Sequence, residues 1–302
     1  MGLVAAPDPL LADALAAIAR EIDSGFDILL PVPDDARSRL FEAMRHAAIG
    51  GGKRLRPLLL TATADLFGVD RNAARRAAIA VEAIHVYSLV HDDLPCMDDD
   101  ALRHGKPTVH RAFDEATAVL AGDAFHALAF ELLADPATSG DPFVRAELVA
   151  TLAAAAGPAG MVGGQAMDMA AETGDFDLPT VTRLQQLKTG ALLSASVEMG
   201  AILGRIPAEG RTHLRGYARA IGLAFQIADD LLDHEGDEAV TGKAVGKDAG
   251  AGKQTFVSLQ GAERAREQAR MLVDQALMHL ANYGTEADLL RAIARYIIER
   301  DR

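Results

Sequence analysis

Tryptophan is absent from this chain of 302 residues, and aromatic residues together make up only 5% of it. Its single cysteine, Cys96, excludes an intrachain disulfide. Structural disulfides belong mainly to oxidising compartments, so this usage is typical of the reducing cytoplasm. We therefore expect a cytoplasmic protein in which Cys96 is a small packing residue.

Patterns that favour β-strands are also scarce. β-Branched residues are few, and apolar and polar residues rarely alternate, whereas alanine and leucine are abundant. Half of the residues are hydrophobic and 24% are charged, so the chain can bury a large core and is not globally disordered. Composition therefore predicts an all-α globular protein.

Positive charge is in short supply, because 30 lysine and arginine residues face 43 acidic ones, for a net charge of −13. Nucleic acid and anionic membranes are therefore poor partners for the surface as a whole. Residues 1–6 lack the features of a signal peptide. Residues 148–167 carry no charge, but glycine and proline interrupt them, so we expect a buried core helix and no membrane insertion.

Helical periodicity organises the chain into two kinds of segment. Five are apolar on nearly every side, which is typical of buried helices: residues 77–90, 116–133, 148–156, 191–203 and 221–232. Residues 11–22, 265–280 and 289–296 place apolar side chains on one face, which predicts outer helices. No long low-complexity linker is present, so we expect one domain spanning residues 1–302.

Two aspartate clusters, each preceded by an apolar helical segment, carry the strongest functional signal. One lies in residues 91–100 and the other in residues 225–233. Adjacent carboxylates repel one another, and their burial is unfavourable unless cations compensate. A single acidic run is usually a solvated surface, but two runs of this kind point to one site with Mg²⁺ bound at two walls.

The spacing within each cluster predicts its geometry. Asp229 and Asp233 lie about 40° apart on a helix, so both project from one face. Asp92 and Asp98 would be about 240° apart on a straight helix. Because Pro95 disfavours a helix at the preceding residue, we expect the helix to end or kink there and the chain to loop back, placing Asp98 beside Asp92.

Basic residues beside flexible turns supply the opposite charge. They occur in Gly51-Gly52-Lys53-Arg54-Leu55-Arg56-Pro57, in Arg103-His104-Gly105-Lys106, in Lys188-Thr189-Gly190, and at Lys243, Lys247 and Lys253. Helix N-termini with neighbouring cations bind anions. Together with the acidic clusters, these residues indicate a cavity that holds diphosphate groups through Mg²⁺.

These motifs, with residues 85–93, Gly163-Gly164-Gln165 and residues 225–233, closely resemble those of short-chain trans-isoprenyl diphosphate synthases, most of all the bacterial farnesyl diphosphate synthases. The resemblance runs from about residue 50 to the C-terminus. It implies a single all-helical bundle of about ten or more helices around a deep central cavity, usually as a homodimer.

The resemblance also implies roles for the acidic residues. Asp92, Asp98 and Asp229 would bind Mg²⁺, as three ions in the full substrate complex. Asp93 would support the first wall, and Asp230 and Asp233 would complete the second.

Roles for the substrate-binding residues follow in the same way. Arg103, Lys188 and Lys243 would hold the allylic diphosphate, and Thr189 and Gln226 would line the reacting allyl group. Gly52, Lys53, Arg56, His85 and His104 would bind isopentenyl diphosphate, and Lys253 would help to close the Gly-rich flap.

The implied reaction is the Mg²⁺-dependent head-to-tail condensation of isopentenyl diphosphate with dimethylallyl or geranyl diphosphate to give farnesyl diphosphate. The family usually has two arginines after the first cluster, and here the second is His104. Histidine lacks the bidentate fork and most of the charge of arginine near pH 7, which puts tight binding of isopentenyl diphosphate in question.

The resemblance implies that Tyr87, with Ser88 beside it, determines the length of the product. Tyr87 lies five positions before Asp92, about 7.5 Å back along the helix, where its ring could form the floor of the cavity. A geranylgeranyl or geranyl diphosphate synthase is the alternative within the class. A terpene cyclase would not need Lys53, Arg56 and His85, and a non-catalytic synthase subunit would be expected to lose an aspartate cluster.

Overall fold

The computed structural model describes residues 8–235 and 254–299, and nearly all of its regular structure is helical. The helices are α1 (Pro9–Leu29), α2 (Ser38–Ala48), α3 (Leu55–Asp65), α4 (Arg71–Asp92), α5 (Val109–Ala112), α6 (Glu115–Ala134), α7 (Pro142–Ala156), α8 (Met161–Ala171), α9 (Leu178–Gln185), α10 (Ala191–Leu203), α11 (Thr212–Glu235), α14 (Phe256–Gln260), α15 (Ala262–His279) and α16 (Asp288–Glu299). Shorter elements are the π-helix η1 (Gln186–Gly190), the 3₁₀ helices η2 (Ala208–Arg211) and η3 (Thr285–Ala287), and the strands β1 (Leu102–Arg103) and β2 (Lys106–Pro107). The expected all-α class is confirmed.

Aspartates outside the two clusters set the starts of several helices. Each accepts a hydrogen bond at its helix N-terminus, which satisfies a backbone N–H that the helix leaves unpaired. These N-caps are Asp8 of α1, Asp70 of α4, Asp114 of α6, Asp141 of α7 and Asp177 of α9. Part of the acidic composition therefore serves local structure and not the site.

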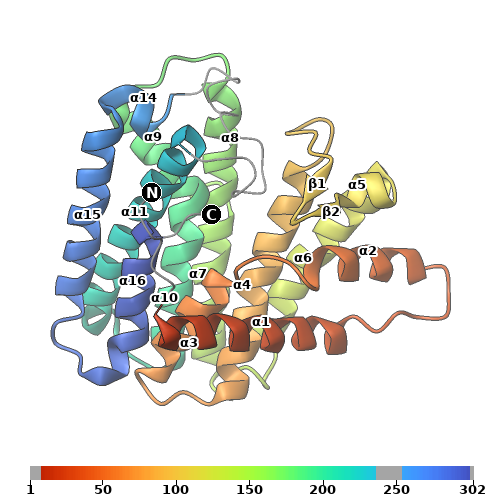
Figure 1. Ribbon diagram of the computed structural model, residues 1–302. Coiled ribbons are helices and arrows are strands. Elements are labelled where there is room, and N and C mark those ends of the chain that lie inside the picture. Colours follow the sequence, from red (N-terminus) through yellow and green to blue (C-terminus); the bar gives the residue numbers. More distant parts are fainter. Residues whose placement is uncertain (1–7, 236–253, 300–302) are drawn as a thin grey trace.

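The helices pack around a shared core (Figure 1). One cluster of buried apolar side chains draws on elements from α1 to α16. Helix α4 lies against α6, and α11 lies against α15. The buried Tyr217 of α11 donates a hydrogen bond to the Leu290 carbonyl oxygen of α16 at 2.7 Å. These contacts place α4 and α11, which carry the two aspartate clusters, in one packed assembly.

The expectation that every apolar segment is buried is wrong for α6 and for residues 148–167. Val119 and Leu120 of α6 are 42% and 56% exposed, and Val162 of α8 is 47% exposed. Residues 148–167 form no single core helix, because a turn separates α7 from α8. Alanine dominates these helices, so their sequences do not distinguish an inner from an outer face.

Two stretches, Glu115–Ala134 and Pro142–Ala171, are long and apolar enough to cross a membrane by length and composition. In the windows that meet these criteria, 44% and 28% of the residues are buried inside the protein. The second stretch is broken between α7 and α8. Because core helices of globular proteins share this composition, the two stretches are weak indications of a membrane span.

Candidate active site

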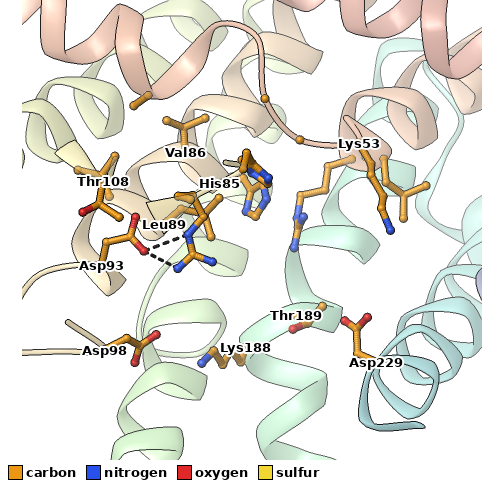
Figure 2. Close-up of a pocket in the computed structure, with 18 of the residues that line it drawn as sticks. Lys53, His85, Val86, Leu89, Asp93, Asp98, Thr108, Lys188, Thr189 and Asp229 are labelled. Carbon is orange, nitrogen blue, oxygen red and sulfur yellow. Dashed lines mark hydrogen bonds and ion pairs between the residues drawn. The ribbon is translucent and has the colours of Figure 1, made fainter. Parts of the chain in front are cut away.

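A cavity of about 1020 Å³ lies between elements that are far apart in the sequence (Figure 2). Most of the predicted site residues line it: Gly52, Lys53, Arg56, His85, Asp93, Asp98, Arg103, His104, Lys188, Thr189, Gln226, Asp229, Asp230 and Asp233. In Figure 2, Asp98 and Asp229 lie on opposite sides, with Lys188 and Thr189 between them. The fold therefore brings both acidic clusters and the cationic motifs to one space.

The first acidic wall is built where α4 ends. The helix stops at Asp92, and the backbone N–H of Asp98 donates a hydrogen bond to the carbonyl oxygen of Asp92 at 2.9 Å. The predicted loop around Pro95 is thus confirmed. Burial raises the pKa of the Asp92 carboxyl to about 6. The nearby charge of Lys188 opposes this rise, and repulsion from Asp98 adds to it. A cation beside these carboxylates would relieve that repulsion.

Asp93 has a different role from Asp92, because its side chain is buried against Arg103. Arg103 Nε donates to Asp93 Oδ1 at 3.0 Å, and a second contact joins Nη2 to the same oxygen. Arg103 Nη2 also donates to Asp100 Oδ2 at 3.1 Å. Two carboxylates therefore hold the Arg103 guanidinium at the cavity wall. Cys96 is exposed in the loop of this wall, so the expectation that it is a packing residue is wrong.

A small β-hairpin, which the helical sequence pattern did not predict, positions Arg103 and His104. Strands β1 and β2 pair antiparallel, and the turn between them consists of His104 and Gly105 with φ values of 52° and 76°. Positive φ at both central residues is typical of tight hairpin turns. The His104 ring consequently lies over the Gly51–Gly52 backbone, where a Cβ atom on Gly51 would approach His104 Cδ2 to 3.1 Å.

The second acidic wall is one face of α11. Asp229 and Asp233 both line the cavity, as their spacing predicted. Asp230 also reaches the lining but is 5% exposed, and its Oδ2 accepts a hydrogen bond from the Phe256 backbone N–H at 2.8 Å. Asp230 thereby fixes the start of α14.

Lys188 and Thr189 project into the cavity from the π-helix η1, an element that often marks functional sites. Lys188 Nζ donates to Asp168 Oδ2 of α8 at 2.7 Å. Helix α8 approaches η1 very closely, because a Cβ atom on Gly164 would lie only 2.2 Å from the Lys188 backbone nitrogen. Gly164 of the Gly163-Gly164-Gln165 motif is therefore explained by close packing against the backbone of Lys188.

The Lys53, Arg56 and His85 side chains gather at another part of the lining (Figure 2 labels Lys53 and His85). Burial lowers the pKa of the Arg56 guanidinium, although the Glu82 carboxylate opposes that shift. Burial and the nearby charges of Arg56 and Arg54 hold the His85 pKa well below its ordinary value. His85 is therefore neutral at pH 7 and can donate one hydrogen bond.

Several cavity residues were missed by sequence reasoning: Glu82, Asp168, Glu172 and Gln185. Glu82 had a detectable signal, since it is the one charged residue in the apolar segment 77–90 and lies three positions before His85. Asp168 lies three positions after Gln165 of the glycine motif. No comparable signal marked Glu172 or Gln185.

The predicted product-length residues do not line the cavity. Tyr87 is 8% exposed, and its ring packs against His91 and against His126 of α6, with centroid distances of 5.7 and 5.2 Å. Ser88 donates a hydrogen bond to the His85 carbonyl oxygen at 2.8 Å. Both residues therefore lie on a part of α4 next to the cavity-lining face.

Three of the predicted cations belong to the Gly-rich segment between the two parts of the chain that the structure describes. Lys243, Lys247 and Lys253 lie outside the described residues. Within residues 8–235 and 254–299, no three His, Cys, Asp or Glu side chains converge closely enough to hold a metal ion by themselves. The facing carboxylates are nevertheless hard oxygen donors of the kind that bind Mg²⁺ together with substrate phosphates.

Comparison with known proteins supplies the family. The model described as Polyprenyl synthetase matches residues 37–295. The farnesyl diphosphate synthase of Escherichia coli (strain K12) is 47% identical over 268 residues, which cover 86% of this chain and 89% of that protein. A chloroplastic geranylgeranyl pyrophosphate synthase from Catharanthus roseus is 45% identical over 266 residues, which cover 87% of this chain and 74% of that protein.

Solved structures agree with the sequence relatives. The crystal structure of an FPP/GFPP synthase from Zymomonas mobilis matches with a TM-score of 0.88 and 59% sequence identity, covering 96% of this chain and 99% of that chain. The motifs, the fold and these relatives agree, and the chain belongs to the polyprenyl synthetase family.

Proposed function

We propose that the chain condenses isopentenyl diphosphate with dimethylallyl and geranyl diphosphates to form farnesyl diphosphate. As a member of the polyprenyl synthetase family it is a prenyltransferase, and bacterial farnesyl diphosphate synthases are among its relatives. The observation that carries the proposal is one cavity lined by two acidic clusters and by two separate groups of cations. Two diphosphate groups need two cationic sites, whereas a terpene cyclase needs one.

The allylic diphosphate would lie between the two acidic walls. Asp92, Asp98 and Asp229 would hold Mg²⁺, which when bound would stabilise the negative charge of the departing diphosphate. Arg103, fixed by Asp93 and Asp100, and Lys188, fixed by Asp168, would donate charge-assisted hydrogen bonds to the same oxygens. Thr189 and Gln226 would line the reacting allyl group.

Isopentenyl diphosphate would bind to Lys53, Arg56, neutral His85 and His104, with the Gly52 backbone beside them. Its double bond would then face the allylic carbon, which becomes cation-like as its carbon–oxygen bond to diphosphate breaks. The double bond attacks this carbon to form the new carbon–carbon bond, and the released diphosphate would accept the proton that the resulting cation loses. The protein contributes placement of both substrates, charge stabilisation and exclusion of water from the cationic carbon.

The product is proposed to have fifteen carbons, as in the farnesyl diphosphate synthases that resemble this chain. Longer products are the alternative, because relatives named as geranylgeranyl pyrophosphate synthases and as an FPP/GFPP synthase are also similar. Tyr87 and Ser88 remain the proposed determinants of length. Because Tyr87 packs against His126 of α6, this role requires the growing isoprenoid chain to extend between α4 and α6.

Further proposals concern the assembly. We propose that three Mg²⁺ ions act in the full substrate complex, that residues 1–302 form one domain, and that the protein is cytoplasmic. We also propose a homodimer, with the exposed apolar side chains of α6 and α7, such as Leu120 and Phe143, covered by a second copy of the chain.

The proposed function is tested by incubating the pure protein with dimethylallyl and isopentenyl diphosphates, with and without Mg²⁺, and sizing the products. We expect Mg²⁺-dependent formation of farnesyl diphosphate. Conversion of the allylic diphosphate without consumption of isopentenyl diphosphate would indicate a cyclase instead, and no turnover would indicate a non-catalytic subunit. Sedimentation analysis measures the oligomeric state independently.

A further inference from the structure

Glu82 is a buried carboxylate that the proposed reaction does not use. It is 2% exposed and belongs to the face of α4 that lines the cavity, together with His85 one turn later. Its Oε1 accepts a hydrogen bond from Arg54 Nη1 at 2.7 Å, and its Oε2 accepts none from the described residues. A buried charge is unfavourable unless it is paired, so this carboxylate calls for an explanation.

Its partner Arg54 connects four parts of the fold. The Arg54 side chain is 3% exposed, and its Nη2 contacts Asp23 Oδ1 of α1 at 2.8 Å and the Ala48 carbonyl oxygen at the end of α2. Asp23 also accepts a hydrogen bond from the Gly50 backbone N–H at 3.1 Å. The guanidinium thus ties the loop before α3 to α1, α2 and, through Glu82, to α4.

The backbone of this loop turns sharply at Arg54, which has a φ of 52° and precedes the first residue of α3. This left-handed conformation is unfavourable for a residue with a Cβ atom, so surrounding contacts must hold it. Lys53, which precedes Arg54, and Arg56, which lies two positions after it, both line the cavity. The buried contacts of Arg54 are therefore in a position to determine where these two cations lie.

We propose that Glu82 is a positioning residue for isopentenyl diphosphate, which acts by holding Arg54 and thereby the loop that presents Lys53 and Arg56. The assignment rests on the proposed function of the cavity. A positioning role and a simple charge effect predict opposite changes in the binding of isopentenyl diphosphate when Glu82 is altered. A carboxylate near an anion site repels the anion, so a charge effect alone would make removal of Glu82 improve binding. A positioning role makes loss of its contact with Arg54 weaken binding.

Two conservative variants separate the effect of the charge of the Glu82 side chain from the effect of its length. Glu82→Asp keeps the charge but shortens the side chain by one methylene, so the carboxylate no longer reaches Arg54. Glu82→Gln keeps the length and an oxygen acceptor but removes the charge. We expect Glu82→Asp to raise the KM for isopentenyl diphosphate by about tenfold, while Glu82→Gln stays within about threefold of the wild type, since a charge-assisted hydrogen bond is replaced by a neutral one.

The KM for dimethylallyl diphosphate should change less than about twofold in both variants, because Arg103 and Lys188 hold that substrate. Glu198→Asp is the matched control. Glu198 is another largely buried glutamate that pairs with two arginines, Arg211 and Arg215, but none of the three lines the cavity. This control should lower the melting temperature without changing either KM.

The inference is overturned if Glu82→Asp leaves the isopentenyl KM unchanged, if it raises both KM values equally, or if Glu82→Gln lowers the isopentenyl KM while Glu82→Asp does not. Should Glu82→Asp fail to fold, the Glu82→Gln result alone decides, because a lowered KM contradicts positioning. A wild-type protein that does not consume isopentenyl diphosphate would instead contradict the proposed function.

Discussion

The backbone N–H of Asp98 donates a hydrogen bond to the carbonyl oxygen of Asp92 at 2.9 Å, across a loop of five residues. This bond brings two carboxylates of the first cluster to one end of α4, although the helix itself ends at Asp92. The opposite wall carries Asp229 on α11. The metal requirement of the enzyme should therefore depend on residues far apart in the sequence.

Removal of either acidic wall should abolish most activity. We expect Asp92→Ala and Asp229→Ala each to lower kcat by at least about a hundredfold, because charge on the leaving diphosphate is left uncompensated. Chelation should stop turnover and Mg²⁺ should restore it. Steady-state assays check this, with Asp274→Ala, an exposed aspartate on α15, as the control that retains full activity. Near-normal turnover by Asp92→Ala or Asp229→Ala would contradict the two-wall arrangement.

Metal binding should depend on pH through Asp92, whose pKa is raised from 3.8 to about 6 by burial. The folded chain then binds a proton more tightly than the unfolded chain, so the stability of the metal-free protein should fall as pH rises from about 4 to about 6. Mg²⁺ must displace that proton, so its apparent affinity should rise across the same range. Thermal unfolding with and without Mg²⁺ at pH 5 and 7 measures both effects, and an unchanged pH dependence in Asp92→Asn would refute the assignment.

His104 stands over the Gly51–Gly52 backbone, beside the proposed isopentenyl diphosphate site. We expect His104→Arg to lower the KM for isopentenyl diphosphate by several-fold, since a guanidinium adds a charged, bidentate donor, and to change the allylic KM less. Measurement of both KM values checks this. A selective effect on the allylic substrate would mean that His104 faces the other diphosphate.

Tyr87 packs against His126 of α6 and does not line the cavity described above. If the growing chain extends between α4 and α6, Tyr87→Ala should shift the products from fifteen to twenty or more carbons with little change in isopentenyl KM. Product sizing by chromatography checks this, with Tyr283→Ala as the control, because that ring packs against Phe67 and neither residue lines the cavity. A variant that still stops at fifteen carbons would rule out Tyr87 as the floor.

Gly164 allows α8 to pack against the backbone of Lys188. In Gly164→Ala, the new Cβ would lie 2.2 Å from the Lys188 nitrogen, so η1 or α8 must move. We expect a loss of about 1–3 kcal/mol in the free energy of unfolding and at least a tenfold fall in kcat. Gly140→Ala, where an added Cβ meets nothing within 4 Å, should leave both unchanged. Denaturant unfolding and turnover measurements test the pair, and equal behaviour of the two variants would show that the close contact is unimportant.

Much of the site was predictable because its signals are local. Helical periodicity placed Asp229 and Asp233 on one face of α11, and the restriction that Pro95 imposes on its neighbour predicted the end of α4 and the return of Asp98. Most of the site residues that the family motifs suggested line the cavity. Such features depend on a few consecutive residues, so the amino-acid sequence by itself determined them.

Other features were decided only by tertiary packing. Residues 77–90 of α4 and 116–133 of α6 are apolar on nearly every side, so their sequences did not determine that Tyr87 would face α6 or that Leu120 would be exposed. The pairing of Arg54 with both Asp23 and Glu82 joins residues 28 to 31 positions apart. Contacts of this kind depend on which helix faces meet, and that choice is made by the packing of the whole core.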